Sequence, residues 1–178
     1  MLLRHATLAD IPEIERVMRE SIAGISSRTY DARQVESSLK FVAHLDRELV
    51  TDETYFVVEA DGEIVACGGW SRRHKLYSGS GAGEDDERLL DPAAEPARVR
   101  AMFVRGDWTR RGLGRAILAS CERAARLEGF RELVLGATLP GVPLYRAFGF
   151  EETERFIVTM PDGVEVTAVA MRRAIDEA

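Results

Sequence analysis

Apolar residues recur at every third or fourth position in the first quarter of the chain. One such series follows a short apolar start at residues 2–6 and consists of Ile11, Ile14, Met18, Ile22 and Ile25. A second series spans residues 32–49, with a break expected near residues 44–46. This spacing places the apolar side chains on one helix face, so it predicts a first strand followed by two amphipathic helices.

The first helix has two competing start signals. Asp10 with Glu13 three positions later forms one capping pair, and Thr7 with Asp10 forms the other. Both pairs put a short oxygen-bearing side chain at a helix start. The two predicted starts of the helix therefore differ by about three residues.

From residue 54 onward the pattern changes to dense β-branched and aromatic runs. Residues 54–60 and 63–72 predict two strands joined by the hairpin turn Asp61-Gly62. Further strands are predicted at residues 99–104, 132–136, 150–160 and 164–171, with one helix ending near residue 128 and a short one closed by Gly149. The order β-α-α-β-β-β-α-β-α-β-β predicts an α/β (α+β) mixed sheet with helices on both faces.

Residues 77–96 carry no periodic pattern. They contain Ser-Gly-Ser-Gly-Ala-Gly, the acidic run Glu84–Glu87 and two prolines. A loop this long in a compact domain is either a solvated excursion or a wall over a functional site, and both interpretations stay open. Nothing divides the 178 residues into two cores, so we expect a single domain over residues 1–178.

Composition narrows the class of protein. The 24 basic and 30 acidic residues give a net charge of −6, which argues against nucleic acid as the main partner. Cys67 and Cys121 stand alone without zinc-ligand spacing, so we expect reduced core thiols and no metal. No signal peptide or run of about 18 apolar residues is present, so we expect no membrane segment and a cytoplasmic location.

An anion site is predicted at the start of the helix that ends near residue 128. Gly112 and Gly114 stand where this helix begins, and the first turn of a helix presents unpaired N–H groups and a partial positive charge. The chain as a whole is acidic, but residues 98–115 are basic. They contain one acidic residue, Asp107, and six arginines, at positions 98, 100, 105, 110, 111 and 115. Arg105, Arg110, Arg111 and Arg115 are candidates to reinforce phosphate binding.

The commonest phosphate motifs do not fit. A Walker A loop requires a Gly-Lys-Ser/Thr ending, which this segment lacks. A dinucleotide fingerprint requires glycine three positions after Gly114, where this chain has Ile117.

The segment Arg111-Gly112-Leu113-Gly114-Arg115-Ala116 resembles the phosphate loop of the GNAT acetyltransferases, Arg/Gln-x-x-Gly-x-Gly/Ala. Downstream, Leu144-Tyr145-Arg146-Ala147-Phe148-Gly149-Phe150 resembles the LYxxxGF segment of the same family. The strand and helix order between the two motifs agrees, and the resemblance extends over essentially the whole chain. It implies a GNAT-like acyl-CoA N-acyltransferase fold, with a mostly antiparallel mixed sheet of about seven strands and about four helices.

The same resemblance implies the roles of individual residues. Acetyl-CoA is the expected cosubstrate, held by Arg110, Arg111, Gly112, Leu113, Gly114, Arg115 and Ala116. Its pantetheine arm is expected to run along Met102, Phe103 and Val104, and an amide near Val104 to polarise the thioester carbonyl. Tyr145 corresponds to the general acid that protonates the leaving thiolate. The Asn that many members have before the LY pair is absent here, and Thr138 offers one hydroxyl nearby.

The expected reaction is acetyl transfer to a primary amine of a small molecule or peptide. The alternative is a non-catalytic CoA-binding regulatory module, and a phosphate-binding protein for nucleotides or RNA is a third, weaker hypothesis. Candidate bases are Glu59, His74 and the Glu84–Glu87 run, and candidate acceptor-pocket residues are Tyr30, Trp70 and Arg72. Exposed strands of the C-terminal hairpin would also allow a homodimer.

Overall fold

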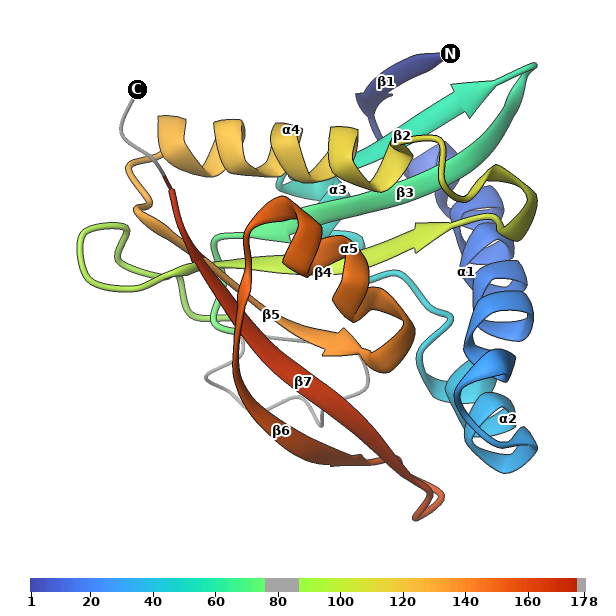
Figure 1. The fold of residues 1–178 in the computed structure, drawn as a ribbon. Coiled ribbons are helices and arrows are strands. Elements are labelled where there is room, and N and C mark those ends of the chain that lie inside the picture. Colours follow the sequence, from blue (N-terminus) through green and yellow to red (C-terminus); the bar gives the residue numbers. More distant parts are fainter. Residues whose placement is uncertain (76–86, 176–178) are drawn as a thin grey trace.

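A seven-stranded sheet organises the molecule. The computed structural model describes residues 1–75 and 87–175, and its strands follow the order β1-β2-β3-β4-β5-β7-β6 (Figure 1). All neighbouring strands are antiparallel except β4 and β5. The strands are β1 (Leu2–His5), β2 (Tyr55–Ala60), β3 (Glu63–Ser71), β4 (Ala97–Val104), β5 (Glu132–Thr138), β6 (Glu151–Thr159) and β7 (Glu165–Ala174).

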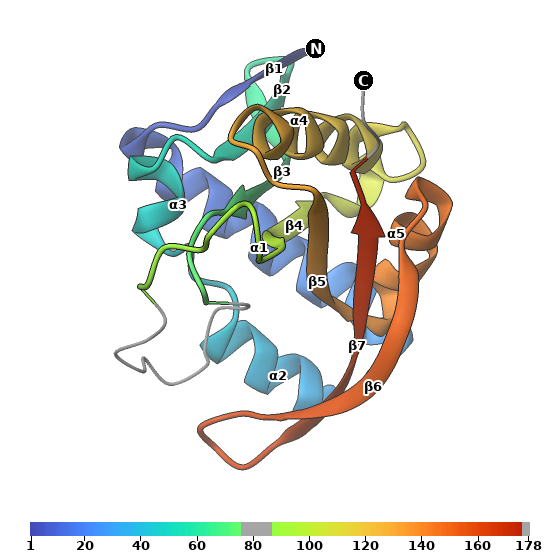
Figure 2. The ribbon, with the colours of Figure 1, turned by 90° about the vertical axis from the view of Figure 1, so that its left-hand side faces the viewer.

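Helices cover both faces of this sheet. Helices α4 and α5 lie on one face, and α1 and α2 lie on the other (Figures 1 and 2). The described residues form five α-helices, one more than expected, because the predicted break divides the second helix in two. The helices are α1 (Ile11–Ile25), α2 (Ala32–Phe41), α3 (Arg47–Thr51), α4 (Leu113–Leu127) and α5 (Val142–Phe148).

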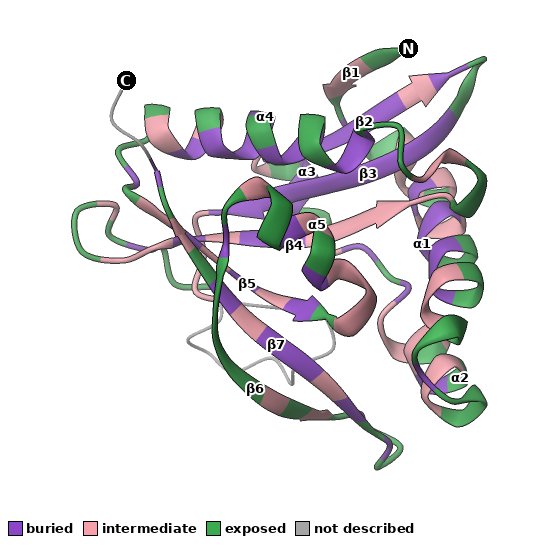
Figure 3. Ribbon diagram, viewed as in Figure 1, coloured by how far each residue is buried: buried purple, intermediate pink, exposed green. Residues whose placement is uncertain are grey.

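The sheet separates two hydrophobic cores. On the α4 side, Ile117, Leu118 and Cys121 pack against the sheet with no exposed surface. On the α1 side, Ile14 and Val17 do the same. Figure 3 shows the inner surface of α4 buried and most of the edge strand β6 exposed. The predicted fold class is therefore confirmed, including the amphipathic helices that the apolar spacing indicated.

None of the helices in the described ranges is both long and apolar enough to cross a membrane.

The two start signals act in succession: Thr7 and Asp10 form a capping box on the 3-10 turn Leu8–Asp10, and α1 begins directly after Asp10, at Ile11. The Asp10 carboxylate accepts hydrogen bonds from the Thr7 amide at 2.7 Å and from the Thr7 hydroxyl at 2.9 Å. The Arg4 guanidinium donates to both carboxylate oxygens, at 2.8 and 2.9 Å. Glu13 instead accepts a hydrogen bond from the backbone of Ile64, so it is not the capping partner.

Replacing Asp10 by asparagine should lower stability at neutral pH by about 1–2 kcal/mol, because a charge-assisted fork to Arg4 is lost. The Arg4 hydrogen bonds lower the pKa of Asp10 below its ordinary value of 3.8. A lowered pKa contributes its full stability above the unfolded value, and this contribution declines below that value until it is lost as the pH falls through the folded pKa. Urea unfolding at pH 7 and pH 3 should therefore show a difference from the parent protein that shrinks at pH 3. Asp61→Asn, in the exposed β2–β3 turn, is the control and should show little effect at either pH.

Strand β4 carries an irregularity that opens the sheet. Cys67 pairs with Phe103 and Gly69 pairs with Arg100, so β4 has one extra residue between these pairs. Ala101 in this bulge has φ 49°, in the left-handed region that side chains other than glycine rarely adopt. A bulge bends its strand and increases the local twist.

The bend has a visible consequence for the neighbouring strand. β4 and β5 pair only at Ala97↔Leu133 and Arg98↔Val134, while β5 continues beside β7 as far as Thr138. Beyond these pairs the two strands diverge, as Figure 1 shows. The second half of β4 is consequently left with an unpaired edge facing the opening.

Candidate active site

The opening between β4 and β5 presents backbone groups of β4. The Arg105 amide donates to the Val65 carbonyl of β3 at 2.9 Å. Successive N–H groups of an extended strand point to opposite edges, so the Val104 amide points away from β3, toward the opening. The partly buried Met102 and Val104 side chains pack against the α4-side core, and Phe103 packs against the α1-side core.

The start of α4 fits a phosphate group. Gly112 is the N-cap residue with φ 80°, and a Cβ at this position would meet no atom within 4 Å. The amides of the first helical turn have no acceptor within the helix, so Leu113, Gly114 and Arg115 can donate outward. The Ala116 amide, by contrast, donates to the Gly112 carbonyl at 3.0 Å. The Ala116 amide is therefore already engaged within the helix, unlike the three amides before it.

Gly114 has a steric role, whereas Gly112 has a conformational one. A Cβ at this position would lie 2.7 Å from Cδ2 of Leu144. The first turn of α4 thus rests directly on α5, and the close contact holds the two sequence motifs together. The paired glycines predicted an anion site, but only the packed structure separates the conformational role of Gly112 from the steric role of Gly114.

The six arginines do not form one cluster. Arg110 and Arg115 are exposed near the helix start, and the Arg111 guanidinium stacks 4.4 Å from the centre of the Trp108 ring. Arg105 is held by Asp107 and Glu63 at 2.7–2.8 Å. The side chain of Arg100 is 3% exposed and pairs with Asp46. Arg110, Arg111 and Arg115 can therefore contact an anion at the helix start while the ion pairs of Arg100 and Arg105 stay intact.

Tyr145 lies in the core where α4 meets α5. It is 8% exposed, and its ring stacks edge-on with Phe150 at 5.8 Å. A Cβ on Gly141 would come within 3.0 Å of this ring, so the glycine allows the close approach. Burial, together with the nearby Cys121, raises the pKa of the Tyr145 hydroxyl. The phenol therefore keeps its proton at neutral pH.

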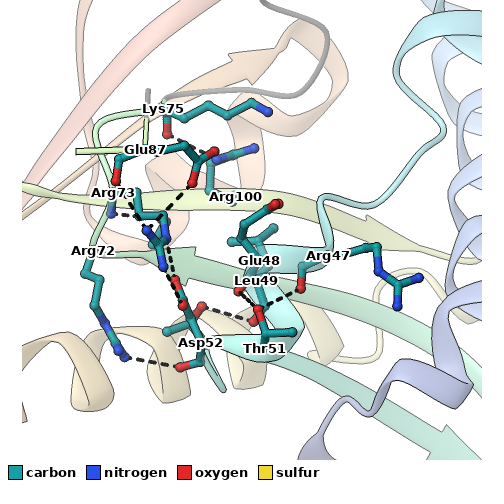
Figure 4. A network of polar contacts seen from close by, with 12 residues as sticks. Arg47, Glu48, Leu49, Thr51, Asp52, Arg72, Arg73, Lys75, Glu87 and Arg100 are labelled. Atoms are coloured by element: carbon teal, nitrogen blue, oxygen red, sulfur yellow. Dashed lines mark hydrogen bonds and ion pairs between the residues drawn. The ribbon is translucent and has the colours of Figure 1, made fainter. Parts of the chain in front are cut away.

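Two predicted acceptor-pocket residues have structural roles instead. Trp70 is 1% exposed and packs edge-on against Phe130 in the α4-side core. Arg72 pairs with Glu128 at 2.6 Å, and its guanidinium lies 5.5 Å from the Trp70 ring centre. Figure 4 shows Arg72 and Arg73 converging on Asp52, which Arg73 binds through two hydrogen bonds of 2.8 Å. The prediction that Trp70 lines an acceptor pocket is thus wrong, because the pleat turns this side chain into the α4-side core, whereas the side chain of Arg72 is 32% exposed.

Tyr30 joins three parts of the chain rather than presenting a free hydroxyl. Its hydroxyl donates to the Thr167 carbonyl and accepts from the Leu139 amide, both at 2.8 Å. It therefore ties the α1–α2 connection to β7 and to the end of β5. The exposed Thr138 ends β5 immediately before Leu139.

The candidate bases lie away from this opening or outside the described residues. Glu59 pairs with Arg4 at 2.8 Å near the β1 edge of the sheet. His74 follows β3, whose last residue pairs with Arg98 at the opposite end of β4 from Val104. Of the acidic run Glu84–Glu87, only Glu87 lies among the described residues, and it pairs with Arg73 at 3.6 Å.

The two cysteines are buried, unpaired thiols. Burial raises the pKa of Cys67 to about 12, so this thiol is protonated at neutral pH. Within residues 1–75 and 87–175, no three metal-ligating side chains gather at one point.

The bulge at Ala101 was not predicted. Its signal in the sequence is the pair Gly68-Gly69 on the facing strand. A Cβ on Gly68 would stand 2.2 Å from the sulfur of Met102, and one on Gly69 would stand 2.7 Å from the Tyr55 ring. Glycines inside a strand often mark a bulge or the close approach of another group.

The family model of the GNAT acetyltransferase domain matches residues 51–152, which include the β4 bulge, the α4 start and Tyr145. The chain belongs to the GNAT acetyltransferases. The resemblance seen in the phosphate loop and the LYxxxGF segment is thereby confirmed.

One curated relative of this GNAT chain is the aminoglycoside N(6')-acetyltransferase type 1 of Stenotrophomonas maltophilia. The two are 29% identical over 106 residues, which cover 58% of this chain and 62% of the relative. The chain thus matches less than two thirds of the length of that enzyme.

Solved structures share the GNAT fold along nearly the whole chain. A GCN5-related N-acetyltransferase from Rhodopseudomonas palustris superposes with a TM-score of 0.72 at 14% identity, covering 97% of this chain and 94% of that one. YncA from Salmonella typhimurium, solved with acetyl-CoA, gives 0.63 at 19% identity, with coverage of 100% and 95%. The PaiA N-acetyltransferase from Thermoplasma acidophilum, solved with coenzyme A, gives 0.63 at 14% identity, with coverage of 97% and 98%.

Proposed function

We propose that this GNAT protein transfers the acetyl group of acetyl-CoA to a primary amine of a small molecule or peptide, by direct attack in a ternary complex. The observation that carries the proposal is the contact between Gly114 and Leu144, which joins the anion site on α4 to the helix that carries Tyr145. A phosphate-binding turn and a protonated phenol thus stand on two helices packed against each other. Acetyl-CoA supplies the activated acyl group.

Each of the chain's groups has a defined part in this proposal. The first-turn amides of Leu113, Gly114 and Arg115 hold the pyrophosphate, and Arg110 and Arg111 add positive charge. The edge of β4 from Met102 to Val104 offers main-chain groups to the pantetheine amides, as an added strand would. The Val104 amide, directed away from β3, is placed to stabilise negative charge on the thioester oxygen.

Tyr145 completes the reaction as the proton donor. When the amine nitrogen forms its bond to the acetyl carbon and the carbon–sulfur bond breaks, the leaving thiolate takes the phenolic proton. The phenolate then regains a proton from water, and the amine loses its extra proton to solvent or to a base. Tyr145 is protonated when the thiolate forms; burial raises its pKa, which makes the phenol a weaker acid, so the role rests on its position on α5 and not on the shift.

The acceptor amine is best sought on the face of the sheet away from α4. The proposed CoA contacts take up the α4 side of the opening, whereas Phe103 and Tyr30 lie on the α1–α2 side. The aminoglycoside acetyltransferase relative makes amino sugars the first acceptor class to test.

The test is release of free CoA thiol from acetyl-CoA with a panel of aminoglycosides, polyamines, amino acids and short peptides. We expect saturable turnover with at least one amine and formation of the matching acetamide by mass spectrometry. Tight acetyl-CoA binding without turnover on any amine class would instead favour the non-catalytic CoA-binding module. Absence of saturable acetyl-CoA binding would overturn both.

A further inference from the structure

A completely buried tyrosine lies under the β4 bulge. Tyr55, the first residue of β2, has no exposed surface. Its hydroxyl donates a 2.6 Å hydrogen bond to the Ala101 carbonyl, 46 residues away in the sequence. The thiol of Cys67, on the strand between them, lies close enough to interact with the same hydroxyl.

The residue that receives this hydrogen bond is the strained one. Ala101 adopts φ 49° in the middle of a strand, a conformation that costs an alanine about 1 kcal/mol or more. Such a conformation persists only where surrounding contacts hold it in place. The hydrogen bond from the Tyr55 hydroxyl is such a contact, and it acts directly on the Ala101 backbone.

The neighbouring strand is shaped to receive both the bulge and the tyrosine. A Cβ on Gly69 would stand 2.7 Å from Cδ2 of Tyr55, and one on Gly68 would stand 3.3 Å from Cα of Met102. The two glycines therefore leave room for the Tyr55 ring on one side and the bulged β4 backbone on the other. The bulge is thus surrounded by residues of three strands: Tyr55 of β2, Gly68 and Gly69 of β3, and Ala101 of β4 itself.

The bulge determines which part of β4 faces the opening. Ahead of it, β4 pairs with β5 at Ala97 and Arg98. Beyond it, Val104 still pairs with Ala66 of β3, but the opposite edge of β4 no longer pairs with β5. The Val104 amide is the group proposed above to face the thioester oxygen. A shift of the bulge by one residue would direct a different amide into the opening.

We propose that Tyr55 is a positioning residue for acetyl transfer: its hydroxyl holds the Ala101 carbonyl in the bulge and thereby sets the direction of the Val104 amide. This inference rests on the proposed function only for its effect on turnover. The conformational part concerns β4 alone and can be tested without any acceptor.

The principal variant is Tyr55→Phe, which keeps the ring and removes only the hydroxyl. We expect kcat to fall about tenfold or more, because small misplacement of a reacting geometry has large kinetic effects. The KM for acetyl-CoA should change less than kcat, because the amides proposed to bind phosphate lie on α4 and only the proposed pantetheine contacts of β4 are disturbed. Hydrogen exchange in peptides covering β4 should increase, with the change concentrated around residues 101–104.

The matched control is Thr54→Val at the adjacent position. Thr54 is 1% exposed, and its hydroxyl donates to the Leu49 carbonyl, away from the bulge. Both variants lose one buried hydroxyl that bonds to a backbone carbonyl, so both should lose stability. Only Tyr55→Phe should lower kcat, and an equal fall in kcat in both variants would overturn the proposal.

A rescue variant separates positioning from stability. Ala101→Gly lets the bulge adopt its positive φ without a Cβ clash. The double variant Tyr55→Phe with Ala101→Gly should regain part of the lost kcat, although it also loses the partly buried methyl of Ala101. Recovery of kcat without recovery of thermal stability would support the proposal, and unchanged kcat would contradict it.

Failure of the two proposals can be told apart. If the parent protein shows no turnover with any amine, the proposed function fails, while exchange in β4 still tests whether Tyr55 holds the bulge. If the parent protein turns over but Tyr55→Phe has parent-like kcat and parent-like exchange in β4, the positioning role fails alone.

Discussion

Tyr145→Phe should lower kcat for acetyl transfer by about a hundredfold or more, the usual contribution of a positioned general acid. The substitution removes the phenolic proton and leaves the ring, which packs against Phe150 and the Gly141 backbone. Acetyl-CoA affinity should change little, because the phosphate contacts lie on α4. The measurement is steady-state thiol release together with isothermal titration of acetyl-CoA.

A second readout distinguishes the acid role from a packing role. With a thioester whose leaving thiol is more acidic than that of CoA, the leaving group needs less protonation, so the loss in Tyr145→Phe should shrink. Phe148→Leu is a useful control, since it alters an aromatic residue of the same helix that stacks with Phe150 at 6.3 Å. Parent-like kcat in Tyr145→Phe would remove Tyr145 from the proposed mechanism while leaving the fold and family unaffected.

Gly114→Val should raise the dissociation constant for acetyl-CoA by about tenfold to a hundredfold, the effect of losing one hydrogen bond to a charged group. Even a Cβ at this position would lie 2.7 Å from Cδ2 of Leu144, and the valine methyls add to the overlap. The first turn of α4 must then move away from α5, which displaces the amides that receive the phosphate.

Two companion variants make this result specific. Gly106→Val lies in the same β4–α4 connection, where a Cβ would meet no atom within 4 Å, and should bind acetyl-CoA like the parent protein. Leu144→Ala combined with Gly114→Val frees space and should restore part of the affinity. An affinity loss in Gly106→Val as large as in Gly114→Val would show that the loop in general, and not the α4–α5 contact, controls binding.

Local chemistry made several features predictable from the sequence. The apolar spacing identified α1 and α2, and Asp61-Gly62 identified the β2–β3 turn, where the structure has φ values of 53° and 81°. Gly149, with φ 104°, ends α5 where the sequence placed the end. Each signal depends on a few consecutive residues, so it acts before any long-range contact forms.

Other features depended on which residues meet across the sheet. Trp70 and Arg72 are among the residues that the sequence offers as candidates to line an acceptor pocket. In the structure the pleat turns Trp70 toward Phe130, and Arg72 reaches Glu128 beyond the end of α4. A one-residue change of register reverses the direction of a strand side chain, and the sequence pattern did not specify that register.

Contiguous motifs such as residues 111–116 and 144–150 were enough to identify the family and the order of the elements and to predict an anion site. The tertiary structure decided how those motifs become a site. It placed Gly114 against Leu144, assigned Arg105 to an ion-pair network and put the Tyr55 hydroxyl beneath Ala101. These contacts join residues 30 to 46 positions apart, and their geometry arises from packing and sheet register, which local sequence patterns do not encode.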